Sequence, residues 1–229
     1  MSKDWFISDT HFDHGNIMKY CNRPGLSEEE QASLASGENF KVSRESVIRM
    51  NDMLIDEINA LVMPEDRIWH LGDFLFGKSN HIFENCRGFL DRINCKEIHL
   101  IRGNHDYSKI EPLFASVQDV AYIKVGSQKL FVSHYAHAVW DQSHRGRIHL
   151  YGHSHATAEE GLDAMMPGRK SADIGVDNLA KVFGKYAPID ISQINDWLGS
   201  REGHSIDHHT KEKTKQWLGK DPNVKEEGG

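Results

Sequence analysis

Side chains that can bind metal ions follow five short apolar runs of the sequence, at the point where each run ends. The clearest run is Ile98 to Ile101, and Gly103, Asn104 and His105 come soon after it. Two aspartates, one asparagine and four histidines follow the five runs: Asp9, His11, Asp73, Asn104, His134, His153 and His155. Ligands of α/β proteins bind beyond the carboxyl ends of strands, so we expect these residues to converge on one site.

These residue types are ligands for divalent cations such as Mn, Fe, Zn or Ni. Seven ligands exceed what a single four- or six-coordinate ion takes from protein, whereas two ions that share a bridging carboxylate would use them all. Two cations about 3.5–4 Å apart suit in-line displacement at phosphorus, because they stabilise both the attacking and the leaving oxygen. The sequence therefore favours a dinuclear site that hydrolyses a phosphoester.

Local spacing supports this convergence. One residue separates Asp9 from His11, and one separates His153 from His155, which puts both side chains of each pair on the same side of an extended chain. A glycine precedes Asp73, and others precede Asn104 and His153, so the backbone can turn closely at these strand ends.

Five motifs together resemble the calcineurin-like metallophosphoesterase family, in the family's order. The motifs are D-T-H at 9–11, G-D at 72–73, G-N-H-D at 103–106, H at 134 and G-H-S-H at 152–155. The segments 9–17 and 140–146 resemble the corresponding segments of small phage and bacterial family members whose substrate is unassigned. The resemblance implies an α/β fold, a four-layer α-β-β-α sandwich, around a dinuclear site.

The resemblance also implies how the ligands divide between two metals. The first metal would be held by Asp9, His11 and His155, and the second by Asn104, His134 and His153, with Asp73 bridging. Manganese is the ion that we expect, and Fe, Ni and Zn are alternatives for the same ligands. A metal-bound hydroxide would attack phosphorus, and His105 would give the leaving oxygen its proton.

The sequence departs from some relatives in the segment after Gly72-Asp73. There the family can carry a second Asp that orients the catalytic histidine, but here Phe74-Leu75-Phe76 follows. We expect Asp106 to substitute, because it is adjacent to His105 and an acid hydrogen-bonded to the imidazole would fix its tautomer.

A cation should offset the charge that develops on the phosphoryl oxygens. The candidates for this substrate-binding role are Arg23, Arg102, His144 and Arg145. We favour His144 and Arg145, because they lie in the loop between two ligand strands. The roles of two further acidic residues stay open. Asp173 and Asp177 either line the site or serve in turns and helix caps.

The elements that must position these residues follow from hydrophobic periodicity. We expect strands at residues 5–8, 67–71, 97–101, 121–125, 129–133, 147–151 and 174–176. We expect helices at residues 43–62, 79–91, 108–114 and 192–198, of which the first is the clearest. The long polar segment 12–42 has only short helical candidates, and it is either a lid or substrate wall or an ordinary surface loop.

Composition limits the range of functions. The chain has 229 residues, enough for one substantial core, and we expect a domain at 1–198 followed by a polar tail at 199–229 that is partly disordered or forms a short helix at 207–218. Three cysteines without C-x-x-C spacing, no signal layout and no membrane-length apolar run favour a cytoplasmic protein with reduced thiols.

The net charge of −7 argues against a broad nucleic-acid-binding face, so the expected partner is a small phosphoester, with a nucleotide favoured. Three rivals remain: a nuclease acting on single strands, a non-catalytic metal-dependent binding module, and a metal-free two-histidine phosphoesterase. The last would use the H-x-T triplets at 155–157 and 208–210 and would survive chelation with EDTA. The sequence leaves the oligomeric state open.

Overall fold

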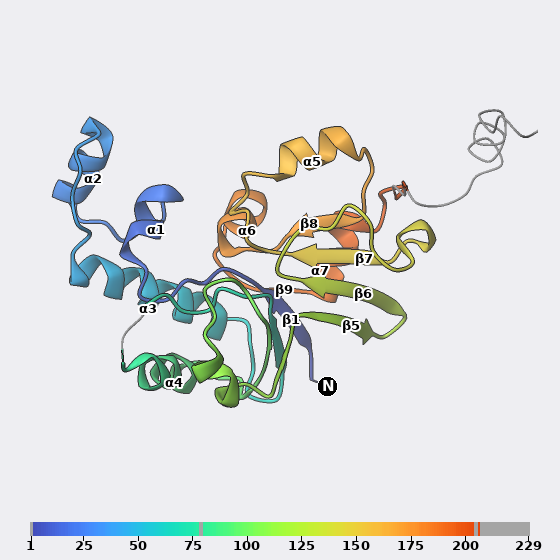
Figure 1. Ribbon diagram of the computed structural model, residues 1–229, viewed down its shortest axis with the longest axis horizontal. Helices are drawn as coiled ribbons and strands as arrows, with labels where there is room; N and C mark the ends of the chain where they lie inside the picture. Colours follow the sequence, from blue (N-terminus) through green and yellow to red (C-terminus); the bar gives the residue numbers. More distant parts are fainter. Residues whose placement is uncertain (1, 78–79, 204–205, 207–229) are drawn as a thin grey trace, which may run out of the picture.

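The computed structural model describes residues 2–77, 80–203 and 206. Two mixed β-sheets lie against one another and are flanked by helices (Figure 1). Apolar residues of both sheets and of their helices form a continuous buried core. The expected α/β sandwich is therefore confirmed.

The first sheet has the strand order β4-β3-β2-β1-β9. Its strands are β1 (Asp4–Ile7), β2 (Arg67–His70), β3 (Glu97–Ile101), β4 (Ser116–Gln118) and β9 (Ile189–Asp190). Strands β1 to β4 are parallel, and β9 runs antiparallel to β1. Because Ile7 pairs with His70, which pairs with Leu100, the carboxyl ends of β1, β2 and β3 lie at one edge.

The second sheet has the order β5-β6-β7-β8. Its strands are β5 (Val120–Val125), β6 (Gln128–Ser133), β7 (Ile148–Tyr151) and β8 (Ser171–Asp173). The hairpin of β5 and β6 is antiparallel, as expected, and β6, β7 and β8 are parallel. A parallel bridge between Ser8 and Gly175 joins the two sheets just beyond β1 and β8. The strand ends of both sheets consequently meet.

Helices cover both sides of the pair of sheets. They are α1 (Gly15–Tyr20), α2 (Glu28–Ser36), α3 (Arg44–Asn59), α4 (Ile82–Arg92), α5 (Glu159–Met165), α6 (Val176–Phe183) and α7 (Ile191–Leu198), with 3-10 turns η1 (Ser108–Leu113) and η2 (Ser143–Arg145). Figure 1 shows α3 and α4 on one side of the molecule and α5 and α6 on the other. None of the helices in the described ranges is both long and apolar enough to cross a membrane.

Helix α3 forms where the sequence predicts it. Its apolar residues recur on one face, and Met50, Leu54 and Ile58 are buried. Ser43 caps its N-terminus by accepting a hydrogen bond from the Ser46 backbone N–H.

The prediction of a strand at residues 174–176 is wrong. Strand β8 ends at Asp173, whose carboxylate accepts a hydrogen bond from the Gly175 N–H at 2.6 Å and turns the chain into α6. Ile174 and Val176 are fully buried, but they fill the core from a turn and a helix start. A short apolar run does not by itself distinguish these structures. Helices α5 and α6 and strand β9 were not expected, and the possible helix at 207–218 lies outside the described residues.

The polar segment 12–42 folds into two helices. Helix α2 begins with a capping box, in which Ser27 and Glu30 each accept a hydrogen bond from the other's backbone N–H. Helix α1 packs against α3. The segment is thus an ordered part of the domain.

Candidate metal centre

The structure brings all seven predicted ligands together beyond the strand ends. One cluster of possible ligand atoms comes from Asp9, His11 and His155, and a second from Asp73, His134 and His153. The Asn104 side-chain oxygen adjoins the second cluster, at 3.1 Å from His134 Nε2 and 3.0 Å from His153 Nδ1. The two clusters contain the residue sets that the resemblance implies.

Asp73 lies between the two clusters. The same carboxylate oxygen, Oδ2, is 3.4 Å from His11 Nε2 in the first cluster and 3.5 Å from His134 Nε2 in the second. Its other oxygen, Oδ1, accepts a hydrogen bond from the His105 backbone N–H at 2.8 Å. Oδ2 is therefore the atom that could bridge two cations.

Several polar atoms of the first cluster are buried without hydrogen-bond partners. These atoms are Asp9 Oδ1 and both ring nitrogens of His11. Buried polar atoms in proteins almost always have partners, because an unsatisfied one costs about 1–3 kcal/mol. A cation bound by Asp9 Oδ1 and a His11 nitrogen would supply the missing partner, so these residues fit a metal ion.

Backbone strain is concentrated at the ligands. Five of the seven have a left-handed backbone, with φ of 57° at Asp9, 47° at His11, 56° at Asp73, 70° at His153 and 47° at His155. This conformation is uncommon for residues other than glycine, and strained backbone clusters at functional sites. The strand ends bend sharply here and aim these side chains inward.

Two glycines, Gly72 and Gly103, allow the turns after β2 and β3 to approach each other closely. A Cβ on Gly72, which has a φ of 98°, would meet the His134 imidazole at 2.5 Å and the Gly103 backbone at 2.7 Å. A Cβ on Gly103 would collide with Asp73 Oδ1. A side chain at position 103 would push the Asp73 carboxylate out of place, and one at position 72 would displace the His134 ring or the Gly103 backbone.

Electrostatics favour a cation between the clusters. Burial raises the pKa of the Asp9 carboxyl to about 7, and the neighbouring Asp173 adds to this effect. Burial acts in the same direction on Asp73, but the adjacent His11 and His134 imidazoles, whose Nε2 atoms lie 3.4 and 3.5 Å from Oδ2, outweigh it and hold the pKa of that carboxyl well below its usual range. Buried carboxylates gathered in this way are stabilised by a positive ion.

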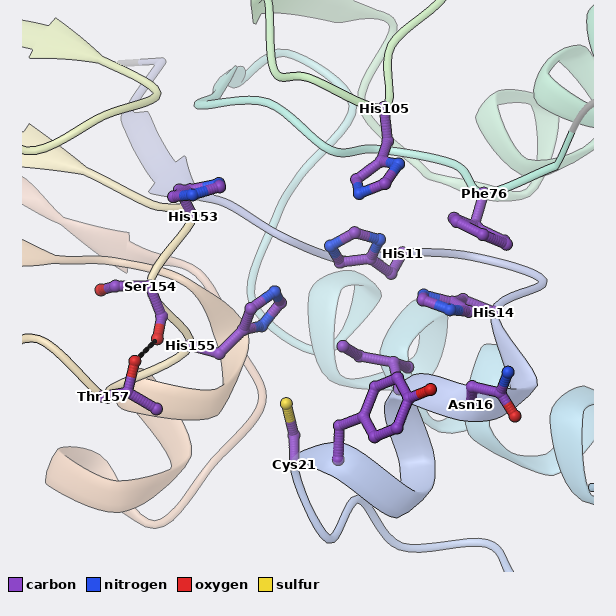
Figure 2. Close-up of a pocket in the computed structure, with 12 residues that line it drawn as sticks. His11, His14, Asn16, Cys21, Phe76, His105, His153, Ser154, His155 and Thr157 are labelled. Carbon is purple, nitrogen blue, oxygen red and sulfur yellow. Dashed lines mark hydrogen bonds between the residues drawn. The ribbon is translucent and has the colours of Figure 1, made fainter. Parts of the chain in front are cut away.

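A pocket of about 740 Å³ opens beside the first cluster (Figure 2). Helix α1 supplies one wall through Asn16, Ile17 and Tyr20. The part of the segment 12–42 around α1 therefore lines this pocket, and its role as a substrate wall stays a prediction. His105 is half-buried and points toward His11, and their ring centroids are 5.4 Å apart.

The sequence matches a family model over about half of its length. Residues 49–169 match the model for the calcineurin-like phosphoesterase superfamily domain. The chain belongs to this superfamily. An uncharacterized protein of Methanocaldococcus jannaschii is 31% identical to it over 194 residues, covering 85% of this chain and 90% of the relative.

Solved structures resemble this superfamily member in fold. A protein of unknown function from Aquifex aeolicus matches with a TM-score of 0.60 and 20% identity, covering 86% of this chain and all of its own. A phosphoesterase from E. coli is 15% identical with a TM-score of 0.33, covering 76% of this chain and 78% of its own. The superfamily typically binds divalent metals, and the clustered His and Asp residues are the candidates to do so in this phosphoesterase-superfamily chain.

The sequence prediction assigned Arg23 the wrong role. Its guanidinium is buried, donates to the Asp9 carbonyl at 2.7 Å and the Thr10 carbonyl at 2.8 Å, and forms a two-point pair with Asp177 at 2.8 Å. A substrate-binding role for Arg23 is therefore corrected to support of the backbone around Asp9. Arg102, a further candidate, pairs with Glu111 and Asp119.

His144 and Arg145 lie at the wrong end of strand β7 for the role expected of them. They form η2, which comes just before Ile148, the first residue of β7, whereas His153 follows its last residue, Tyr151. The chain leaves the site after His134 and returns to the amino end of the sheet before β7 begins. Position in a loop between two ligands does not indicate position at the site, and a substrate-binding role for these residues is corrected.

Asp106 supports two loops rather than the His105 imidazole. Its carboxylate accepts hydrogen bonds from the backbone N–H groups of Asp73 and Gly103 at 2.8 Å and of Phe74 at 2.9 Å. These bonds tie the turn after β2 to the turn after β3. The expectation that Asp106 orients the His105 ring is corrected accordingly.

Three supporting residues answer or extend the sequence prediction. Asp177 accepts a hydrogen bond from His155 Nδ1 at 2.7 Å, which leaves Nε2 of this ligand for an ion. Asp173 accepts hydrogen bonds from Ser154 and Ala156 and stabilises the turn between them.

Tyr135, which the sequence analysis did not single out, donates a hydrogen bond from its hydroxyl to the Asn104 side-chain oxygen at 3.3 Å. It directly follows the ligand His134, and this adjacency was the available signal.

Proposed function

We propose that this chain is a phosphoester hydrolase that uses two divalent cations. The observation that supports this proposal best is the position of Asp73 Oδ2, between His11 and His134 of the two clusters. The unpartnered Asp9 and His11 atoms beside it add to the same inference.

The seven predicted residues would hold the cations in two groups. Asp9, His11 and His155 would bind one, and Asn104, His134 and His153 the other, with Asp73 shared. Imidazole, carboxylate and amide ligands suit manganese, and they also accept Fe, Ni and Zn. Bound here, the cations would acidify a water for attack on phosphorus and offset charge on the phosphoryl oxygens.

His105 is the residue that we propose as the general acid. Its backbone is held by Asp73 Oδ1, while its ring projects into the pocket beside His11. A leaving oxygen on this side of the phosphoryl group would take its proton from His105. Such proton transfer contributes about 10²–10⁴-fold to rate.

The pocket suits a small substrate. Its volume of about 740 Å³ lies within the range of small-molecule sites. The net charge of −7 opposes binding of a long polyanion. We propose a small phosphoester as the substrate, with nucleotides as the leading candidates.

The test is to remove the metals with a chelator and restore them one kind at a time. Protein reloaded with Mn, Ni, Zn or Mg is assayed on p-nitrophenyl phosphate, bis-p-nitrophenyl phosphate, 2′,3′-cyclic nucleotides and single-stranded DNA. We expect no turnover without metal, recovery with manganese above the other ions, and no activity on DNA. Two bound ions without turnover of any ester would indicate a binding module, and turnover that survives chelation would refute the metal mechanism.

An Asp73→Asn variant makes this test specific to the bridging carboxylate. We expect it to lose at least one of the two ions and most of the turnover. His99→Asn is the matched control, because His99 lies on β3, stacks on Trp69 and is not a predicted ligand.

A further inference from the structure

The aromatic part of the pocket wall is exposed, and one of its residues, Phe76, lies beside His105. Phe76 is 36% exposed and Tyr20 is 72% exposed, and both line the pocket. The His14 ring stacks on Phe76, with centroids 3.7 Å apart and planes inclined by 10° (Figure 2). Large aromatic side chains are ordinarily buried, so exposed rings gathered at a pocket mark a surface for a ligand.

This wall adjoins the proposed general acid. The ring centroids of Phe76 and His105 are 5.3 Å apart. A phosphoryl group at the metal ligands, with its leaving oxygen at His105, would place whatever is attached to that oxygen against Phe76. Phe76 would therefore face the leaving group.

The pocket lining also lacks formal charge beyond its histidines. Its described residues include no Lys, Arg, Asp or Glu. Further phosphates on the leaving group would find no Lys or Arg among these described lining residues, and burying unpaired charge is costly. A neutral planar group would instead stack on an aromatic face, which is worth about five- to hundred-fold in affinity for a nucleobase.

We infer that Phe76, His14 and Tyr20 form a subsite for the planar aromatic part of the leaving group, such as the base of a nucleoside monophosphate. Asn16, exposed on the same wall, offers both a donor and an acceptor to the edge of that base. The inference rests on the proposed function and adds to it a preference for esters with a single phosphate whose leaving group contains a planar aromatic ring.

The test compares two ligands that differ only in the base. Adenosine 5′-monophosphate and ribose 5-phosphate present the same phosphate on the same sugar carbon. Their dissociation constants are measured by calorimetry on manganese-loaded protein that carries His105→Asn, which slows hydrolysis of the ligands during the titration. The otherwise wild-type protein, called the wild type below, is compared with Phe76→Ala, Phe76→Leu and Tyr20→Ala in the same background. We expect the wild type to bind the nucleotide about tenfold more tightly. The ratio should fall toward one in Phe76→Ala and fall part of the way in Phe76→Leu and Tyr20→Ala.

The control is Tyr122→Ala, which removes a ring that is 61% exposed on β5, outside the pocket lining. Equal affinities for the two ligands in the wild type would overturn the inference. Phe76→Leu keeps an apolar side chain at this position, and it serves as the test if Phe76→Ala fails to fold. A ratio of affinities that is unchanged in Phe76→Leu would also overturn the inference. Because binding is measured directly, the inference is judged apart from turnover. A protein that prefers the nucleotide but hydrolyses no ester would contradict only the proposed function.

Discussion

The role proposed for His105 is to give a proton to the leaving group, and the need for that proton depends on the leaving group. An alkoxide is strongly basic and needs protonation as the bond breaks, whereas p-nitrophenolate leaves readily without it. We expect His105→Asn to lower kcat/KM by about 10²–10⁴-fold for an alkyl phosphoester and much less for a p-nitrophenyl ester. The measurement is steady-state kinetics on both substrates at full metal loading, and equal losses on the two would argue against a general acid.

Asp106 is expected to matter for the loops and not for proton transfer. Asparagine at this position presents an amide where three backbone N–H groups need an acceptor. We expect Asp106→Asn to lower the free energy of unfolding by about 1.5–3 kcal/mol, the usual worth of a hydrogen bond to a charged group. Denaturant unfolding measures this change.

With both cations bound, the Asp106→Asn variant should keep a kcat near that of the wild type. A large fall in kcat at full metal loading would restore the idea that Asp106 orients His105.

At the scale of elements, Arg23 connects three parts of the chain that are distant in sequence. It follows α1, holds the carbonyls beyond β1, and pairs with Asp177 in the first turn of α6. Removing one partner of a buried pair costs about 3–5 kcal/mol, because the other charge is left uncompensated. We therefore expect Arg23→Gln to lose that much unfolding free energy, measured by denaturant titration.

The control for Arg23 is Arg92→Gln. Arg92 pairs with Asp52 on the surface, where both side chains are close to half exposed, and such pairs contribute under about 1 kcal/mol. Similar losses of unfolding free energy in the two variants would show that burial of the Arg23–Asp177 pair adds nothing to stability.

Glu30 couples α2 to α3 in a pH-dependent way. Burial raises its pKa, but hydrogen bonds from the Ser46 hydroxyl and from the Ser43 and Ser27 backbone outweigh this and lower the pKa to about 2. A carboxyl with a lowered pKa stabilises the fold above its unfolded pKa, and this stabilisation is lost as pH falls through the folded value.

We expect Glu30→Gln to have a lower Tm than the wild type at neutral pH, and the difference to shrink between about pH 4.5 and pH 2. Thermal unfolding followed by circular dichroism at several pH values tests this. A difference that stays constant over that window would contradict the role given to the ionised carboxylate.

At the scale of the whole molecule, the predicted metal ligands connect the two sheets. Asp9, Asp73 and Asn104 follow strands of the first sheet, and His134, His153 and His155 follow strands of the second. A cation in either cluster would bind residues from both sheets, and any ion that binds only the folded state stabilises it.

Chelation should therefore lower the Tm of the loaded protein. At a free metal concentration of 100 times Kd, each ion contributes about 2.7 kcal/mol, which corresponds to about 5–10 °C in a domain of this size. Scanning calorimetry with and without EDTA measures the change, and Asp73→Asn should respond much less. A wild-type Tm that ignores chelation would show that metal binding is not coupled to the fold.

The sequence by itself determined the family, the order of the ligand residues and the strands that precede them. These features depend on local patterns: an apolar run that ends in a glycine and a ligand, or an apolar face that recurs along α3. The seven residues Asp9, His11, Asp73, Asn104, His134, His153 and His155 were identified in this way, and the structure brings them together.

Only the tertiary structure decided which other residues reach the site. Arg23 and Asp177 are 154 positions apart in the chain, and their pairing depends on how α1 and α6 pack. His144 lies between two ligands in sequence, but the chain carries it to the far end of β7. Local patterns specify elements, whereas side chains meet through the path of the whole chain, and that path is set by long-range packing and sheet order.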